Sequence, residues 1–310
     1  MPTNLPVIVV YSSTPKPITS TTIPTPVPTK TPIPAEWVEI KTGTTETINS
    51  IWFIDFNTGW AVGTKGTIRH TTNAGATWKA QNKGTNDLWG VCFIDANNGW
   101  VAGGNGVIFK TTDGGSSWTL LDSGGTGTIM DIKFINQNDG IFTNGGGIYH
   151  TNDGGQTWVK KSDYGGGSIF YRNDGKAWHS SGYKLVGGAW QQIPDFGFDG
   201  ITFADNQKGY AWRGNFSKTT DGGNTWTILD KIVTDDEIIR NPSVDGVAFV
   251  NPSEGRMIGY SDYVTKNGGD TWTKVSDNTY RSSYITYFTL FNDVNHGWTF
   301  NSPTIYRLGY

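Results

Sequence analysis

From Glu36 onwards, short apolar segments alternate with polar turn sequences in a pattern that returns throughout the chain. In residues 91–121 the apolar segments read VCFID, GWVAG, VIFKT and SWTLL, and residues rich in Gly, Asn and Asp separate them. Strand-length apolar runs bounded by turn residues predict β-strands. The unit returns after about 40 residues, a period typical of propellers and solenoids. Each unit is therefore predicted to contain four strands.

Five copies of the unit align with one another, and they share an inner FID-type segment and a terminal Thr-Thr-Asp-Gly-Gly-x-Ser/Thr-Trp phrase. They are residues 53–78, 93–118, 134–158, 203–226 and 249–272. A sixth copy, 170–190, keeps Gly-Gly-x-Trp but lacks the Thr and Asp, so we interpret it as a degenerate blade.

The seventh copy, 291–310, ends before its last strand. The missing strand is found at the other end of the folded part, because EWVEIKTG at 36–43 aligns with SWTLLDSG at 117–124 and puts Trp37 in the place of Trp118. A first strand that completes the last repeat closes a ring and excludes an open solenoid. The sequence therefore predicts an all-β, seven-bladed β-propeller over residues 36–310.

The repeated phrase lies between the third and fourth strand of each unit, which predicts a hairpin turn. Its Asp or Asn is expected to accept hydrogen bonds from main-chain N–H groups two residues on, and its glycines to take positive φ. The Trp is expected to bury its ring between blades. This structural role is assigned to Asn73, Asp113, Asp153, Asp221 and Asn267, and to Trp78, Trp118, Trp158, Trp226 and Trp272.

The phrase is that of the Asp-box, or BNR, repeat. The motifs FIDANNGWVAGG and TTDGGSSW are close to the repeat of the photosystem II assembly and stability factor family, and on this basis the whole of 36–310 resembles the propellers of that family. The resemblance implies a seven-bladed propeller and an assembly role; photosynthetic members bind their partner with an arginine-rich patch. Here the arginines are scattered over different blades, so we expect a bacterial relative outside photosynthesis. They are Arg69, Arg172, Arg213, Arg240, Arg256, Arg281 and Arg307.

Residues 1–35 have a different composition. The stretch 11–34 contains seven of the 13 prolines in a Thr-rich background without hydrophobic periodicity. Such a segment is predicted to be a disordered linker or stalk, and at about 3.1 Å per residue its last 20 residues would reach roughly 60 Å. We expect the propeller to be displayed outside the cytoplasm, at the cell surface or secreted, with any membrane attachment through an N-terminal anchor. A tail without function is the alternative.

Charge and reactive side chains restrict the possible partners and cofactors. The net charge of −3 and the lack of a basic cluster do not favour a nucleic-acid partner. Cys92, the one cysteine, lies inside the apolar VCFI run and is expected in the core. The histidines fall on different blades, and each repeated turn supplies at most one carboxylate, whereas a calcium loop needs several oxygen ligands. No metal or cofactor is expected. The histidines are His70, His150, His179 and His296.

The turns after the first and third strands should share one face of the ring. The loops between second and third strands and the connections between blades should form the other, here called the variable-loop face, where binding is expected. Candidate binding residues are Trp89, Tyr164, Phe198, Arg213, Phe216, Arg240, Tyr260, Tyr263, Tyr280 and Arg281. The alternative for each aromatic is that it fills a seam between blades. The main hypothesis is a monomeric, non-catalytic binding or assembly module for a protein partner or a polysaccharide.

A glycan-active enzyme is the alternative function, because Asp-box repeats also occur in sialidases and xyloglucan-degrading hydrolases. Asp235, Glu237 and Asp262 could supply the acid and base of a glycoside hydrolase. A sialidase is less favoured, since its Arg-Ile-Pro phrase is not found ahead of the first Asp box. A purely structural surface protein is the third possibility.

Overall fold

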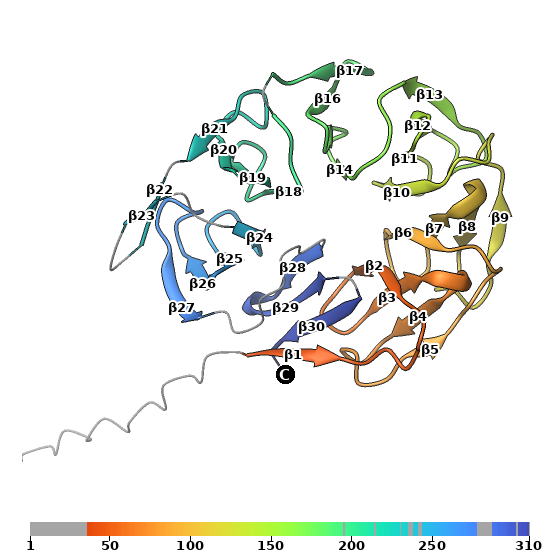
Figure 1. Cartoon of the computed structure of the whole chain (residues 1–310), viewed down its shortest axis with the longest axis horizontal. Coiled ribbons are helices and arrows are strands. Elements are labelled where there is room, and N and C mark those ends of the chain that lie inside the picture. The colour runs from red at the N-terminus through yellow and green to blue at the C-terminus, as the bar shows by residue number, and fades with distance from the viewer. Residues whose placement is uncertain are drawn as a thin grey trace, which may run out of the picture. The chain divides into compact units, whose positions relative to one another are not determined.

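The computed structural model describes residues 36–194, 196–213, 215–229, 231–234, 238–240, 244–277, 287–301 and 303–309. The chain divides into two units, Met1–Ile33 and Pro34–Tyr310, and the second contains every described element (Figure 1). The predicted linker lies outside the described residues. Among the residues described, no helix has the length and apolar character needed to cross a membrane.

Seven four-stranded antiparallel sheets form a ring, with the first strand of each sheet nearest the centre (Figure 1). Blade 1 consists of β2 (Ile48–Phe53), β3 (Gly59–Gly63), β4 (Ile68–Thr71) and β5 (Lys79–Ala80), and blade 2 of β6 (Leu88–Phe93), β7 (Gly99–Gly103), β8 (Ile108–Thr111) and β9 (Thr119–Leu121). Blade 3 consists of β10 (Ile129–Phe134), β11 (Gly140–Asn144), β12 (Gly147–Thr151) and β13 (Val159–Ser162). Blade 4 consists of β14 (Ile169–Tyr171), β15 (Ala177–His179), β16 (Tyr183–Val186) and β17 (Ala189–Gln192).

Blades 5 to 7 complete the ring. Blade 5 consists of β18 (Gly200–Phe203), β19 (Gly209–Arg213), β20 (Asn215–Thr219) and β21 (Thr227–Leu229). Blade 6 consists of β24 (Val244–Phe249), β25 (Gly255–Gly259), β26 (Ser261–Thr265) and β27 (Thr273–Asp277). Blade 7 consists of β28 (Tyr287–Phe291), β29 (Asp293–Asn301), β30 (Thr304–Leu308) and β1 (Trp37–Ile40). Short 3-10 turns, η1 (Thr64–Gly66) and η2 (Gly104–Gly106), join the second and third strands of blades 1 and 2. The seven-bladed prediction is confirmed, and the degenerate copy is blade 4.

Closure of the ring follows the predicted register. β1 pairs antiparallel with β30, with Trp37 opposite Leu308 and Ile40 opposite Ile305. The N-terminal strand is therefore the outermost strand of blade 7, and the prediction that it completes the last repeat is confirmed.

A two-stranded sheet that the repeats did not predict lies between blades 5 and 6. It consists of β22 (Lys231–Val233) and β23 (Ile238–Arg240). Thr234 forms a parallel bridge with Trp272, whose main-chain N–H donates to Val233 O at 2.9 Å. The insertion therefore attaches to the start of the outer strand of blade 6.

Neighbouring blades are joined by a repeated aromatic contact. The Trp that follows the first Gly of the second strand stacks on the Phe of the next blade's first strand. The ring centroids are 3.5 Å apart for Trp60–Phe93 and 3.7 Å apart for Trp100–Phe134. The Gly before the Trp is required because a Cβ at Gly99 would lie 2.4 Å from the Phe93 ring. Each Gly-Trp dipeptide thus makes two close contacts: the Gly lies against the Phe ring of its own blade, and the Trp stacks on the Phe ring of the next blade.

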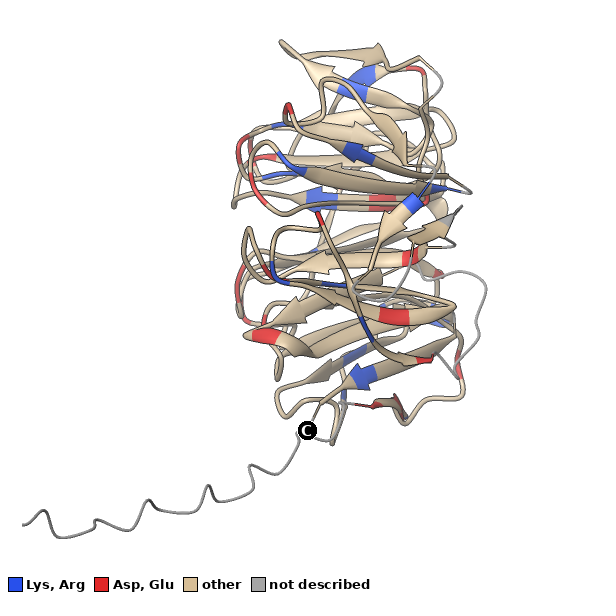
Figure 2. Cartoon of the chain, turned by 90° about the vertical axis from the view of Figure 1, so that its left-hand side faces the viewer, with Lys and Arg blue, Asp and Glu red and all other residues tan. Residues whose placement is uncertain are grey.

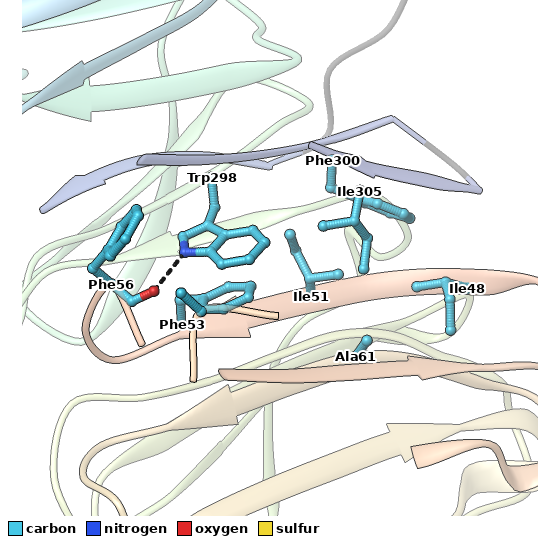
Figure 3. Packing of buried hydrophobic residues seen from close by; sticks show 9 residues of the cluster. Ile48, Ile51, Phe53, Phe56, Ala61, Trp298, Phe300 and Ile305 are labelled. Carbon is cyan, nitrogen blue, oxygen red and sulfur yellow. Dashed lines mark hydrogen bonds between the residues drawn. The ribbon is translucent and has the colours of Figure 1, made fainter. Parts of the chain in front are cut away.

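The same contact closes the ring between blades 7 and 1. Trp298 stacks on Phe53 at 4.0 Å, and its indole N–H donates to Phe56 O at 3.0 Å (Figure 3). Ile51 and Phe300 are buried beside it in the same cluster (Figure 3). The two ends of the folded part are therefore joined both by strand pairing and by an apolar core.

Replacing Trp298 with Ala tests this closure. The side chain is fully buried, so we expect the free energy of unfolding to fall by about 3–5 kcal/mol, the usual cost of truncating a buried Trp. Leu120→Ala is the control, because Leu120 is 62% exposed on an outer strand and should change the value by about 0.5 kcal/mol or less. Urea denaturation measures both; equal effects would contradict the proposed importance of the seam.

Candidate functional site

The Asp-box turn is held by a closed set of hydrogen bonds. In blade 2, Thr111 Oγ1 donates to Asp113 Oδ1 at 2.8 Å, and the main-chain N–H of Gly115 donates to Thr111 Oγ1 at 2.8 Å. Ser117 donates its main-chain N–H to Asp113 Oδ1 at 2.8 Å and its hydroxyl to Oδ2 at 2.6 Å. The main-chain donor lies four residues on, not two as expected, because the carboxylate spans the whole turn.

The turn has the same geometry in the other complete boxes. The main-chain N–H four residues on lies 2.9 Å from the side-chain oxygen of Asn73, Asp153 and Asp221, and 3.0 Å from that of Asn267. In the Asn boxes the amide nitrogen donates to the Thr hydroxyl that elsewhere donates to a carboxylate. Both glycines of the blade 2 turn have positive φ, as predicted: 68° at Gly114 and 88° at Gly115.

Hydrogen bonding also stabilises the ionised form of these carboxylates. The hydroxyl and main-chain N–H of Ser117 lower the pKa of Asp113 to about 2, and Thr157 lowers the pKa of Asp153 to about 2 in the same way. The oxygens of each carboxylate are bonded within its own turn. Among the described residues, no three His, Cys, Asp or Glu side chains gather to hold a metal ion.

The Asp-box turn and the turn after the first strand lie side by side on one face, as predicted. The main-chain N–H of Gly114 donates to Asn97 O at 2.9 Å, and that of Ala74 donates to Asn57 O at 3.0 Å. Figure 2 shows the propeller from its edge, and there Lys and Arg are interspersed with Asp and Glu.

Exposed apolar side chains lie at the opposite ends of the first strands. Trp89 and Met130 occupy equivalent bulges in β6 and β10, the neighbouring inner strands of blades 2 and 3, and are 44% and 48% exposed. Met130 Sδ lies against Gly166, in the connection to blade 4. Tyr164, in the same connection, is 53% exposed and stacks on Tyr183 at 4.0 Å. Trp89, Met130 and Tyr164 are called here the blade 2–4 patch.

The patch contains two predicted binding residues and one that was missed. Met130 could have been found by aligning the bulge positions, since it stands where blade 2 has Trp89.

Two other predicted binding residues are exposed but lie outside this patch. Arg213 is exposed at the end of β19, and its Nε lies 3.7 Å from Asp199 Oδ1. Tyr260 is 68% exposed on blade 6.

Two predicted binding residues require correction. Phe198 is 2% exposed and packs with Trp178 in a cluster of blades 4 and 5, and Phe216 is 1% exposed and stacks on Tyr210. Both fill seams: Phe198 turns inwards from the connection between blades 4 and 5, and Phe216 lies on β20 itself, not in a loop. Tyr263 is partly buried against the same cluster as Tyr210.

Several candidates lie outside the described residues. These are Tyr280, Arg281, Asp235 and Glu237, together with the side chain of Arg240, whose main chain belongs to β23.

Asp262 was predicted as a loop carboxylate and is instead 1% exposed on β26. Its Oδ2 accepts from Arg256 Nη2 at 2.7 Å and from Trp37 Nε1 at 2.9 Å. Arg256 occupies the second-strand position where blades 1 and 2 have Trp, and its Nη1 donates to Val294 O of blade 7 at 3.1 Å. Asp262 therefore neutralises a buried seam residue and is not placed to act as acid or base. The sequence held one sign of this pair: GRMIG at 255–259 has an Arg where blades 1 and 2 have the buried Trp of GWAVG and GWVAG, and a buried Arg needs a carboxylate nearby.

Comparisons with known proteins agree with this architecture. A family model described as photosynthesis system II assembly factor YCF48 matches residues 30–183. None of the curated proteins matches the chain. The solved structure "YCF48 bound to D1 peptide" is 22% identical, covers 90% of this chain and 96% of its own, and has a TM-score of 0.68.

Two further solved structures are similar. YCF48 from Cyanidioschyzon merolae is 20% identical, covers 88% of this chain and 98% of its own, and has a TM-score of 0.64. A GH74 xyloglucanase from Xanthomonas campestris is 12% identical, covers 89% of this chain and 53% of its own, and has a TM-score of 0.62. At these identities the likeness concerns the fold.

The Asp-box bonds predict a specific tolerance at Asp113. Because Asn73 and Asn267 build the same turn, Asp113→Asn should leave the free energy of unfolding at pH 7 nearly unchanged, whereas Asp113→Ala should lower it. The folded-state pKa is depressed from 3.8 to about 2, so the carboxylate's contribution is complete above about pH 4 and is lost as the pH falls through 2. Unfolding measured from pH 7 to 2 should therefore show wild type losing stability relative to Asp113→Asn; a constant difference would contradict this.

The buried pair predicts a different outcome at Asp262. Asp262→Ala leaves Arg256 charged and without its carboxylate, which should lower the free energy of unfolding by about 3–5 kcal/mol. The double variant Arg256→Met/Asp262→Leu should recover much of this loss, because it removes both charges. Denaturation of the three proteins tests the pair; full stability of Asp262→Ala would show that the carboxylate is not needed in the seam.

Proposed function

Because the chain is a Ycf48-like Asp-box propeller, we propose that it is a non-catalytic binding or assembly module that recognises a protein partner through the blade 2–4 patch. The observation that carries the proposal is the exposure of Trp89, Met130 and Tyr164 at the ends of the inner strands. Exposed apolar side chains such as Leu120, Ile228 and Tyr260 also occur elsewhere, whereas these three belong to the inner strands of adjacent blades and to the connection that Met130 contacts.

The chemistry of the patch favours a protein over a polysaccharide. Aromatic residues and Met are enriched at the centres of protein interfaces, and Trp and Tyr are frequent hot spots. A charged pair, Lys160–Asp163 at 2.6 Å, lies next to Tyr164 and supplies the polar rim that such interfaces have. The position also supports the proposal, since the patch lies on rigid inner strands and on one short connection. In the similar YCF48 structure the bound molecule is a peptide.

The hydrolytic alternative has less support. Of its three candidate carboxylates, Asp262 is bonded inside a seam, and Asp235 and Glu237 lie outside the described residues. The likeness to a xyloglucanase is a likeness of fold.

We further propose that the propeller acts as a monomer outside the cytoplasm. The Thr/Pro-rich composition of residues 11–34 supports this, since such segments serve as spacers. With an anchor at the N-terminal side, the length of this spacer would set how far the propeller lies from the membrane.

Selection from a displayed library of random peptides, with the full chain as bait, tests the protein-binding proposal. Peptides that bind wild type should bind Trp89→Ala about 30-fold more weakly or worse, the loss expected for an interface hot spot of 2 kcal/mol. Ile228→Ala is the matched control, because Ile228 is 57% exposed on the outer strand of blade 5, away from the patch. Equal affinity of the selected peptides for wild type and Trp89→Ala would place binding elsewhere.

A further inference from the structure

A polar pocket lies in the seam between blades 1 and 2, on the Asp-box face and therefore opposite the blade 2–4 patch. Its volume is about 480 Å³, within the range of about 300–1,000 Å³ usual for small-molecule sites. Blade 1 and blade 2 both contribute to its walls. The lining residues used below are Thr58, His70, Lys79, Gln81, Asn97 and Asp113.

The equivalent place in four of the other six seams is bridged by a cation, whereas blade 3 has His150 and blade 6 has Val264 there. One third-strand position carries Lys110, Lys184, Lys218 and Arg307 in blades 2, 4, 5 and 7. Each side chain reaches the Asp-box turn of the next blade, at Gly154 O (3.4 Å), Asn224 O (3.4 Å), Asp270 Oδ1 (2.8 Å) and Ala74 O (2.7 Å) respectively. The long side chain both fills the outer part of the seam and satisfies an acceptor there.

Blade 1 has His70 at this position. Its imidazole stacks on Trp60, with ring centroids 4.5 Å apart and planes within 3°, and does not extend across the seam. The acceptor that a lysine would reach, Gly114 O, is bonded by Gln81 Nε2 at 2.9 Å. The volume that a lysine occupies in other seams is thus left open.

Two residues that line the pocket have a buried polar atom without a hydrogen-bond partner in the described structure: His70 at Nε2 and Gln81 at Oε1. A buried polar group without a partner is costly, and in native proteins it is usually satisfied by water, an ion or a ligand. His150, the corresponding histidine of blade 3, differs because its Nε2 lies 2.9 Å from Asp139 Oδ1. A histidine at this position can therefore be satisfied within the protein, and His70, which lines the pocket, is not.

The lining has little net charge and many groups that both donate and accept. It combines the hydroxyl of Thr58, the amides of Asn97 and Gln81, one ammonium at Lys79 and one carboxylate at Asp113. Burial, helped by the charge of Lys79, lowers the pKa of His70, so the imidazole is neutral at pH 7 and can donate or accept. An anion would find the single ammonium offset by the carboxylate, and a divalent cation would find that carboxylate already bonded to Thr111 and Ser117.

We propose that the seam between blades 1 and 2 is a binding site for a small neutral polyhydroxylated ligand of the class of a single sugar unit. Hydroxyl groups can donate to Gln81 Oε1 and exchange hydrogen bonds with His70 Nε2 after a small movement of the two side chains. The site is independent of the protein-binding patch, because it lies at the other end of the strands and in a different seam.

The test uses the full chain and exchanges residues between equivalent positions of different blades. His70→Lys introduces the residue that blades 2, 4 and 5 carry and should bridge to the next turn, filling the pocket without disturbing the fold. His150→Lys makes the same change in blade 3 and is the matched control. Methyl glucoside, methyl galactoside and N-acetylglucosamine, with inorganic phosphate as an anionic probe, would be titrated by saturation-transfer NMR.

The expected result is that at least one saccharide binds wild type and His150→Lys equally and binds His70→Lys at least about tenfold more weakly. If His70→Lys fails to fold, Gln81→Leu, which copies Leu121 of blade 2, removes the unpartnered carbonyl and should weaken binding in the same way. The proposal is overturned if no saccharide binds up to about 10 mM, tenfold above a Kd of 1 mM. It is also overturned if the variant binds as wild type does, or if only phosphate binds.

Discussion

The contact on which the ring depends is the stack of a second-strand indole on the phenylalanine of the next blade, together with the hydrogen bond from that indole N–H to a turn carbonyl. Trp60 and Trp100 donate to Gly114 O and Gly154 O of the following Asp box, at 3.3 and 3.2 Å. One side chain therefore satisfies its own polar atom, buries a large apolar area and fixes the position of the neighbouring hairpin. The Asp box must in turn be rigid, because its carbonyl is the acceptor, and this explains why so many of its polar atoms are bonded within the turn.

Two departures from this contact, in blades 3 and 6, are compensated close by. Blade 3 has Ile141 in place of Trp, and there Tyr171 of blade 4 donates to Asp139 Oδ1 at 2.6 Å while Ile141 packs in an aliphatic cluster with Ile169. Blade 6 has Arg256, and Asp262 and Trp37 are recruited to neutralise and cover it. A buried charge is tolerated only when it is paired and hydrogen-bonded, so these two residues depend on the substitution at position 256.

Much of the fold could be predicted because each strand repeats the same local chemistry. Aligning Trp37 with Trp118 was enough to predict closure, since both begin an outer strand. The β22–β23 hairpin could not be predicted, as it belongs to no repeat. The site was harder: Trp89 and Phe198 are both aromatics in variable segments, and only the three-dimensional course of the chain decides that one faces solvent and the other a seam. Asp262 shows the same limit, because its partners Arg256 and Trp37 come from another strand and from the opposite end of the chain.

A ring held by one repeated contact can vary at positions that this contact does not use. The bulges of the inner strands are such positions, because strand pairing continues past Asn49, Trp89 and Met130 whatever their side chains are. The third-strand position of the seams is another, since the stack beneath it is complete with Lys110, with Lys218 or with His70. These two sets lie on opposite faces. The stereotyped Asp-box face is therefore not chemically uniform: in the seam between blades 1 and 2, where His70 replaces the bridging cation, it contains an open volume lined by hydrogen-bonding groups.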